Sequence, residues 1–271
     1  MSILKNYIQI QYKSLKIIRS YTCMLLTNYT GYKVYGTGVF IQIEDNFLLV
    51  SASHVLDNFE NLFIPIEEGK NLFKPGGISF INETSNSRNE DSVDIGFLKL
   101  DEESVKEILT TYKFLQDDDL AINHKFENQP FYTFLGFPQT FSKFSHSRNS
   151  FHSYPFFQFS TPIMESKYLK YDKSPNLNII TSYERKKSYN LKIKQFSVGP
   201  DLHGLSGCGL WFTNPMDILT QTEKPKLTAI MTDWPIKDRT KVIDTRIDVL
   251  TEVLRKKLNL KLPESNIISV K

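Results

Sequence analysis

Short apolar runs, separated by turn-forming residues, follow one another along the chain from residue 22. The first set reads CMLLTNY, KVYGTGVFIQI, NFLLVSASHVL, NLFIPI, GGISFI and DIGFLKL. Apolar runs of this length, bounded by Gly, Pro, Asn and Ser, are typical of β-strands. Six such runs within about eighty residues predict a sandwich or barrel.

A helix and a second set of strands are predicted next. Residues 101–116, DEESVKEILTTYKFLQ, open with acidic residues and then carry apolar residues at helical spacing, which predicts a surface helix. The helical positions are Val105, Ile108, Leu109, Tyr112 and Leu115. The later runs are PFYTFLGFP, FFQFSTPI, LKIKQFSV, CGLWF and KLTAIMTDW. The pattern therefore predicts two β-rich halves joined near residues 101–128.

Both ends of the chain have helical patterns. Residues 1–21 form an N-terminal extension with a weak apolar face and several cations. Such a helix either packs on its own domain, which we favour, or binds a membrane surface. Residues 246–258, RIDVLTEVLRKKL, have leucines at helical spacing and cations in the last turn, so we expect a C-terminal helix that lies on a barrel.

The composition excludes several classes of protein. The 271 residues are 40% hydrophobic and 23% charged, as in ordinary globular domains, and 20 Phe with 13 Tyr favour β-sheet. A net charge of +3 gives no reason to expect a nucleic-acid partner. No apolar run is long enough to span a membrane, and lysines interrupt the first twenty residues. We therefore expect a cytoplasmic protein whose mature chain begins near Met1.

The two cysteines, Cys23 and Cys208, imply neither a disulfide framework nor a zinc site, because they lack the CxxC spacing. A bridge between them is arithmetically possible but unexpected in a reducing compartment. No metal or organic cofactor is expected. Residues 165–194 contain eight basic and three acidic residues. This segment is either a partner-facing loop or, as we favour, a solvated insertion.

One short stretch suggests chemistry. In HGLSGCGLW, residues 203–211, the glycines 204, 207 and 209 surround Ser206. They can mark a tight turn before a strand, or a loop that exposes a serine nucleophile and turns backbone N–H groups toward a developing oxyanion. A nucleophilic serine also requires a base, and the base requires an orienting group.

His54 is the best base among the five histidines, because FLLVSASHVLDN places it at the end of an apolar strand. Asp94, in DSVDIGFLKL, is the candidate orienting carboxylate, because a partly buried acid at the start of an apolar run needs a hydrogen-bond partner. Asp91 is the alternative. Each residue alone is equally typical of ordinary strand ends and turns.

The blocks GTGVFI, LLVSASHVL, DIGFLKL and GLSGCGLW stand in the order and rough spacing of trypsin-like serine peptidases. YTFLGFP and AIMTDW also resemble strands of that family, and the similarity covers about residues 22–258. The resemblance implies a mainly β protein with two six-stranded β-barrels, an inter-barrel helix and a C-terminal helix. The barrels would occupy residues 22–116 and 117–245, followed by the helix and tail at 246–271.

The same resemblance implies roles for individual residues. His54 would be the general base, Asp94 its orienting carboxylate and Ser206 the nucleophile. The backbone N–H groups of Gly204 and Ser206 would form the oxyanion hole. The substrate-binding residues would be Asp201, Asp233 and Trp234. A carboxylate at Asp201 would favour Lys or Arg in the substrate, although a shift of one residue in the alignment would remove this preference.

Four positions depart from the family pattern. Leu205 replaces the aspartate that pairs with a newly cleaved N-terminus in secreted members. Cys208 replaces a glycine, and we interpret it as a small buried thiol and not as a nucleophile. Asp233 replaces a serine beside the triad, and Pro235 has no N–H to offer an extended substrate.

We therefore expect a regulated intracellular serine endopeptidase that cleaves a protein or peptide substrate, with an activating or docking partner. The resemblance is to small bacterial members without a signal peptide, some of which act in defence or stress systems. The alternative is a catalytically silent fold of this type that serves as a protein-binding module. A third reading is an unrelated β-barrel in which Gly204–Gly209 is only a turn.

Overall fold

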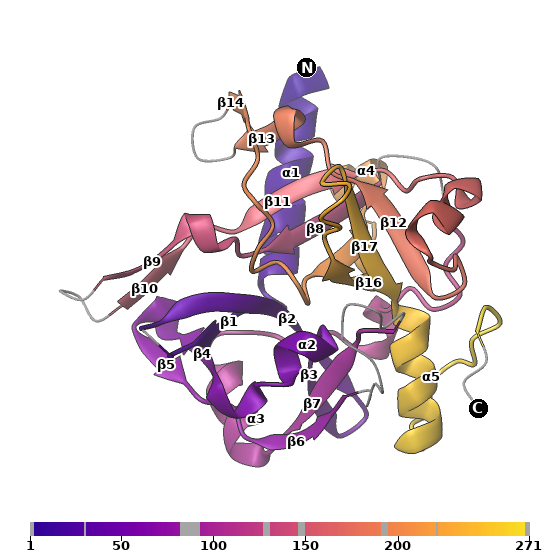
Figure 1. Cartoon of the computed structure of the whole chain (residues 1–271). Coiled ribbons are helices and arrows are strands. Elements are labelled where there is room, and N and C mark those ends of the chain that lie inside the picture. The colour runs from indigo at the N-terminus through magenta and orange to yellow at the C-terminus, as the bar shows by residue number, and fades with distance from the viewer. Residues whose placement is uncertain are drawn as a thin grey trace.

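The computed structural model describes seven parts of the chain, namely residues 3–29, 31–81, 93–126, 131–145, 150–190, 195–220 and 222–268. Within them the protein is mainly β, with two curled antiparallel sheets and a few helices (Figure 1). The mainly β class predicted from the apolar runs is confirmed, and the arrangement is consistent with a two-barrel fold.

The first sheet has seven strands in the described residues, in the order β5-β4-β1-β2-β3-β7-β6. The strands are β1 (Thr22–Thr27), β2 (Lys33–Ile43), β3 (Asn46–Ser51), β4 (Leu62–Ile66), β5 (Asn71–Phe73), β6 (Gly77–Phe80) and β7 (Gly96–Leu100). Six of them coincide with the predicted runs. The extra strand, β5, has only three residues, so its apolar pattern was too short to identify.

The second sheet has six strands in the described residues, in the order β11-β8-β15-β16-β17-β12. They are β8 (Tyr132–Gly136), β11 (Phe156–Ser160), β12 (Asn178–Ser182), β15 (Gly209–Phe212), β16 (Lys226–Asp233) and β17 (Lys241–Arg246). Two short hairpins accompany it, β9 (Ser142–Ser145) with β10 (Ser150–Ser153) and β13 (Ser188–Asn190) with β14 (Gln195–Ser197).

The basic segment 165–194 contains β12, which pairs with β17. Ile179 and Ile180 on this strand are fully buried. Residues 178–182 of the segment are therefore part of the second sheet and not of a solvated insertion. The sequence did not predict this five-residue strand, because the surrounding Lys, Asn and Ser residues are polar and its burial depends on pairing with β17.

The helices are α1 (Ile3–Arg19), α2 (Ser53–Leu56), α3 (Glu102–Leu109), α4 (Pro215–Thr220) and α5 (Ile247–Lys257). α1 packs on the molecule itself: Ile10 and Ile18 are buried, and Lys13 Nζ donates hydrogen bonds to carbonyl groups of α4 at 3.4 Å. None of the helices that the structure describes has both the length and the apolar character needed to cross a bilayer.

The helix predicted over residues 101–116 is shorter than expected. α3 begins after Asp101, whose side chain accepts a hydrogen bond from the Ser104 N–H at 2.8 Å. It ends at Leu109, which is exposed. Leu115 instead lies in extended chain, where its N–H donates to Phe40 and its carbonyl accepts from Gln42, both in β2. The hydrogen bonds of Leu115 with the first sheet therefore prevail over the helical spacing of the apolar residues in 101–116.

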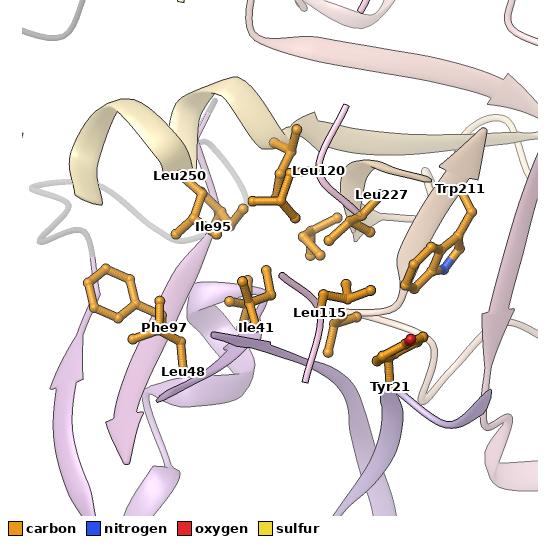
Figure 2. Close-up of a cluster of buried hydrophobic side chains, with 14 of the residues drawn as sticks. Tyr21, Ile41, Leu48, Ile95, Phe97, Leu115, Leu120, Trp211, Leu227 and Leu250 are labelled. Atoms are coloured by element: carbon orange, nitrogen blue, oxygen red, sulfur yellow. The ribbon is translucent and has the colours of Figure 1, made fainter. Parts of the chain in front are cut away.

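Apolar side chains from both sheets meet in one buried cluster (Figure 2). Members include Ile41, Leu48 and Phe97 of the first sheet, Trp211 and Leu227 of the second, Leu115 and Leu120 of the connection, and Leu250 of α5. Trp211 is fully buried, with the Tyr21 ring 6.4 Å away. Because this core belongs to both sheets, its packing fixes the position of one sheet against the other.

A buried ion pair lies at the start of α5. The Arg246 Nε atom is 3.3 Å from Asp248 Oδ2, and both side chains are almost completely buried. Arg246 Nη2 also donates to the His124 carbonyl at 2.7 Å, and its guanidinium lies 4.4 Å from the Phe126 ring centroid. Asp248 Oδ1 accepts from the Ser265 hydroxyl at 3.1 Å. The cluster therefore ties the C-terminal tail to the second sheet.

We expect His124 in this cluster to make the stability of the protein sensitive to acid. Burial, followed by the nearby Arg246 cation, lowers its pKa to about 4, while Asp248 opposes the shift. A folded-state pKa below the unfolded value of about 6.5 gives stability that is complete above pH 6.5 and falls as the pH drops toward 4. We expect wild type to lose on the order of 2 kcal/mol more than His124→Gln over this range.

Urea unfolding at pH 7.5, 6.0 and 4.5 measures this difference. The His124 Nε2 atom lies 2.8 Å from the Tyr132 hydroxyl, so Gln at this position retains a polar partner. Equal pH dependence of the two proteins would contradict the assignment to His124.

Candidate active site

His54 and Asp94 are joined by two hydrogen bonds. The ring Nδ1 of His54 lies 2.5 Å from Asp94 Oδ2, and the backbone N–H of His54 donates to Asp94 Oδ1 at 3.0 Å. The pairing of Ser51 in β3 with Gly96 in β7 brings these segments together. Asp94 is buried, whereas the His54 side chain is 34% exposed. The pair therefore has one face in the core and one toward solvent.

The sequence predicted that His54 lies at the end of a strand, and this prediction is wrong. β3 ends at Ser51, and His54 belongs to the short helix α2. The N–H groups of Val55 and Leu56 both donate to the Ala52 carbonyl, which turns the chain immediately after β3. The alternative acid, Asp91, lies outside the described residues.

This geometry suits a general base. A carboxylate that accepts a hydrogen bond from Nδ1 keeps the proton on that nitrogen and leaves Nε2 with a free lone pair. It also stabilises the imidazolium that forms when Nε2 takes a proton. Because the backbone N–H holds the second carboxylate oxygen, Asp94 has little freedom to rotate.

The Ser206 loop depends on two glycines. Gly204 has φ +95° and Gly207 has φ +89°, a region that residues with a side chain rarely adopt. A β-carbon on Gly204 would lie 2.7 Å from the Phe137 carbonyl oxygen, and one on Gly207 would overlap the Thr37 carbonyl oxygen. Both positions thus exclude any larger residue.

Hydrogen bonds hold most of the peptide groups in this loop. The carbonyls of His203, Leu205 and Ser206 accept from Gln139, Cys208 and Thr37 at 2.9, 2.8 and 2.8 Å, respectively. The N–H groups of Leu205 and Gly207 donate to Leu202 and Met231. Among the described residues, the N–H groups of Gly204 and Ser206 donate to no acceptor. These are the two groups that the resemblance to trypsin-like peptidases assigns to an oxyanion hole.

The Ser206 loop approaches α2 across β2. A β-carbon on Gly36 would lie 2.6 Å from Val55 Cγ1 and 3.1 Å from the Ser206 carbonyl oxygen, so both segments touch the same point of β2. Val55 directly follows His54. No hydrogen bond joins the Ser206 hydroxyl to the His54 ring in the described part of the chain. The structure thus brings the segments that carry His54, Asp94 and Ser206 to one region, without a hydrogen bond between the Ser206 hydroxyl and the His54 ring.

Asp233, at the end of β16, adds a second carboxylate near the His54–Asp94 pair. Its side chain reaches the surface, but neighbouring atoms partly desolvate it, and this raises its pKa. Lys173 opposes the shift, and weaker electrostatic interactions connect Asp233 with His54 and Asp94. Asp233 is therefore within electrostatic range of the pair.

The other two predicted substrate-binding residues have partners within the protein. Asp201 Oδ1 forms a half-exposed ion pair with Arg185 Nη1 at 3.1 Å. The Arg239 guanidinium lies 3.9 Å from the Trp234 ring centroid, and the His203 ring lies 5.7 Å away. A ligand would have to share or displace these contacts. Sequence reasoning did not identify Arg185 or Arg239. Arg239 lies only five residues after Trp234, in the turn between β16 and β17, whereas the fold brings Arg185 beside Asp201.

Both cysteines are free and fully buried, and burial raises the pKa of each thiol. The prediction that Cys208 is a small buried thiol is confirmed, since its Sγ lies 3.8 Å from Met231 Sδ. His, Cys, Asp and Glu side chains in the described residues form no group of three that could hold a metal ion.

A surface hollow of about 490 Å³ between β3 and α3 contains none of the candidate residues; its lining includes Phe47, Leu100 and Val105.

No family model matches this chain, and no curated protein matches it.

Proposed function

We propose that the protein is a trypsin-like serine endopeptidase that uses His54, Asp94 and Ser206. The observation that carries the proposal is the double hydrogen bond between His54 and Asp94. The buried Asp94 carboxylate binds both the ring and the backbone N–H of the partly exposed His54, and such an arrangement orients a histidine to act as a general base. The serine loop near this pair, with two unused N–H groups, supports the same chemistry.

In the proposed reaction, the Ser206 hydroxyl attacks a peptide carbonyl while His54 Nε2 takes its proton. The N–H groups of Gly204 and Ser206 stabilise the oxyanion, and the imidazolium then protonates the leaving amine. Water hydrolyses the resulting acyl-enzyme by the reverse sequence of proton transfers. This reaction needs no metal or organic cofactor.

The proposed substrate is a protein or peptide. Asp201 would attract a Lys or Arg side chain only in competition with Arg185, so the preference for basic residues should be weaker than an unpaired carboxylate would give. The ring contacts of Trp234 also occupy one face of a predicted binding residue. Both features favour regulation by a partner or by loop rearrangement, as expected for an intracellular peptidase that acts in defence or stress.

The second candidate function is a catalytically silent protein-binding module of the same fold. The Ser206 hydroxyl and the His54 ring form no hydrogen bond in the described part of the chain, and this favours the binding module. A competent triad forms that hydrogen bond at least in the substrate complex. Catalysis is the stronger proposal, because a silent protein has no chemical need for the His54–Asp94 pair.

Reaction with a fluorophosphonate probe tests the proposal. We expect labelling of wild type at Ser206, located by peptide mass spectrometry, because the probe reacts only with an activated serine hydroxyl. Ser206→Ala and His54→Ala should remain unlabelled. Ser197→Ala, which removes a serine that the structure places on β14, is the matched control and should label like wild type.

Absence of labelling in the purified protein and in lysate of its native host would overturn the peptidase proposal and favour the binding module. Labelling in the lysate alone would support a peptidase that requires a partner. Labelling at a serine other than Ser206 would contradict the assignment of the nucleophile.

A further inference from the structure

Thr37 contacts the serine loop at two places, although it belongs to the other sheet. It lies in β2 and is fully buried. Its backbone N–H donates to the Ser206 carbonyl at 2.8 Å, and its hydroxyl donates to the Gly204 carbonyl at 2.8 Å. One residue of the first sheet therefore holds the carbonyl groups on both sides of Leu205.

Thr37 is itself fixed by both sheets. The Ser51 hydroxyl in β3 donates to the Thr37 carbonyl at 2.8 Å, and the Phe137 N–H, directly after β8, donates to the Thr37 hydroxyl oxygen at 3.3 Å. A hydroxyl has one hydrogen and accepts through its lone pairs, so accepting from Phe137 leaves that hydrogen for Gly204. The direction of the Thr37 hydroxyl is thereby determined.

These bonds control the orientation of the loop peptides. In a trans peptide the carbonyl and the N–H point in opposite directions. The Gly204–Leu205 peptide is held by Thr37 at its carbonyl and by Leu202 at its N–H, at 2.9 Å. The Ser206–Gly207 peptide is held by Thr37 and by Met231, at 2.7 Å. The Leu205–Ser206 peptide between them carries the unused Ser206 N–H, and its carbonyl accepts from the Cys208 N–H at 2.8 Å. Thr37 thus holds the peptides on both sides of it.

We infer that the Thr37 hydroxyl is a positioning residue for the oxyanion hole, and this inference rests on the proposed function. Thr37 is buried and touches no substrate. It acts by holding the Gly204–Leu205 peptide, which lies between the peptide that carries the Gly204 N–H and the peptide that carries the Ser206 N–H, so that both N–H groups keep their orientation toward an oxyanion. The first sheet thus contributes to the loop that carries the nucleophile, in addition to the base and the carboxylate.

Three variants separate this role from ordinary packing. Thr37→Val removes the hydroxyl but keeps the side-chain shape and the backbone N–H, and Thr37→Ser keeps the hydroxyl. Thr228→Val is the matched control, because the Thr228 hydroxyl is also buried and also donates to a carbonyl, that of Leu210, at 2.8 Å. If Thr37→Val does not fold, Thr37→Ala replaces it.

Fluorophosphonate labelling gives the first readout. Thr37→Val should lower the labelling rate at saturating probe about 100-fold and change the half-saturating probe concentration by less than about 3-fold, since the donors act on the transition state. Thr37→Ser should restore most of the rate. Thr228→Val should stay within about 3-fold of wild type, although it loses a comparable hydrogen bond.

Amide hydrogen exchange of residues 203–209 gives a second readout that needs no activity. The bonded N–H groups of Leu205, Gly207 and Cys208 should exchange about tenfold faster in Thr37→Val than in Thr228→Val. Equal effects of the two Val variants in both readouts would overturn the inference while wild-type labelling still supported the peptidase. A wild type that never labels would overturn the peptidase, whereas faster loop exchange would still show that Thr37 holds this loop.

Discussion

Asp94→Asn should lower the rate of fluorophosphonate labelling about 10⁴-fold at pH 7, because it imposes the wrong tautomer on His54. The backbone N–H of His54 donates to Asp94 Oδ1, so an Asn side chain would place its carbonyl oxygen there. Its NH₂ group would then face Nδ1 of the ring, where Oδ2 lies at 2.5 Å in wild type. Nδ1 would become an acceptor, the proton would move to Nε2, and Nε2 could no longer accept the Ser206 proton.

Labelling time courses at pH 7 measure this effect, with Asp101→Asn as the control. Asp101 caps α3 through a hydrogen bond from the Ser104 N–H, and Asn is an equally good cap. Asp101→Asn should therefore label at the wild-type rate. A loss of less than about tenfold in Asp94→Asn would mean that Asp94 does not orient a catalytic base.

Asp248→Ala should destabilise the protein by about 3–5 kcal/mol, because it leaves the buried Arg246 cation without its counter-charge. Arg246 is 4% exposed, and its other contacts, the His124 carbonyl and the Phe126 ring, carry no full negative charge. The variant also removes the acceptor for the Asn123 N–H and the Ser265 hydroxyl. Urea unfolding at pH 7 measures the change in the free energy of unfolding.

Adding Arg246→Met to Asp248→Ala should recover part of this loss, since an apolar side chain in place of an unpaired buried cation no longer requires a partner. Asp248→Asn should lie between wild type and Asp248→Ala, because it keeps an acceptor for Asn123. A loss below about 1 kcal/mol in Asp248→Ala would contradict the view that Arg246 depends on this carboxylate.

The sequence by itself determined the elements whose signal is local. Alternating and continuous apolar runs bounded by turn residues located most strands of both sheets, and the leucine spacing after Arg246 located α5 within one residue at each end. The block around Ser206 indicated a loop that needs glycine, and the positive φ values of Gly204 and Gly207 agree with that need. His54 and Asp94 were chosen as partners from their positions next to apolar runs, and the structure joins them.

Only the tertiary structure decided the features that depend on contacts between distant segments. β12 was hidden in a basic, polar segment because its burial comes from pairing with β17. The helix predicted over residues 101–116 ends at Leu109, and Leu115 instead forms backbone hydrogen bonds with Phe40 and Gln42 of β2. The ion pair of Asp201 with Arg185 and the bonds from Thr37 to the serine loop join residues far apart in the sequence. The local spacing of apolar residues predicts whether a segment prefers helix or strand. The hydrogen-bond partner of a buried polar group depends on which distant segments the tertiary fold brings next to it.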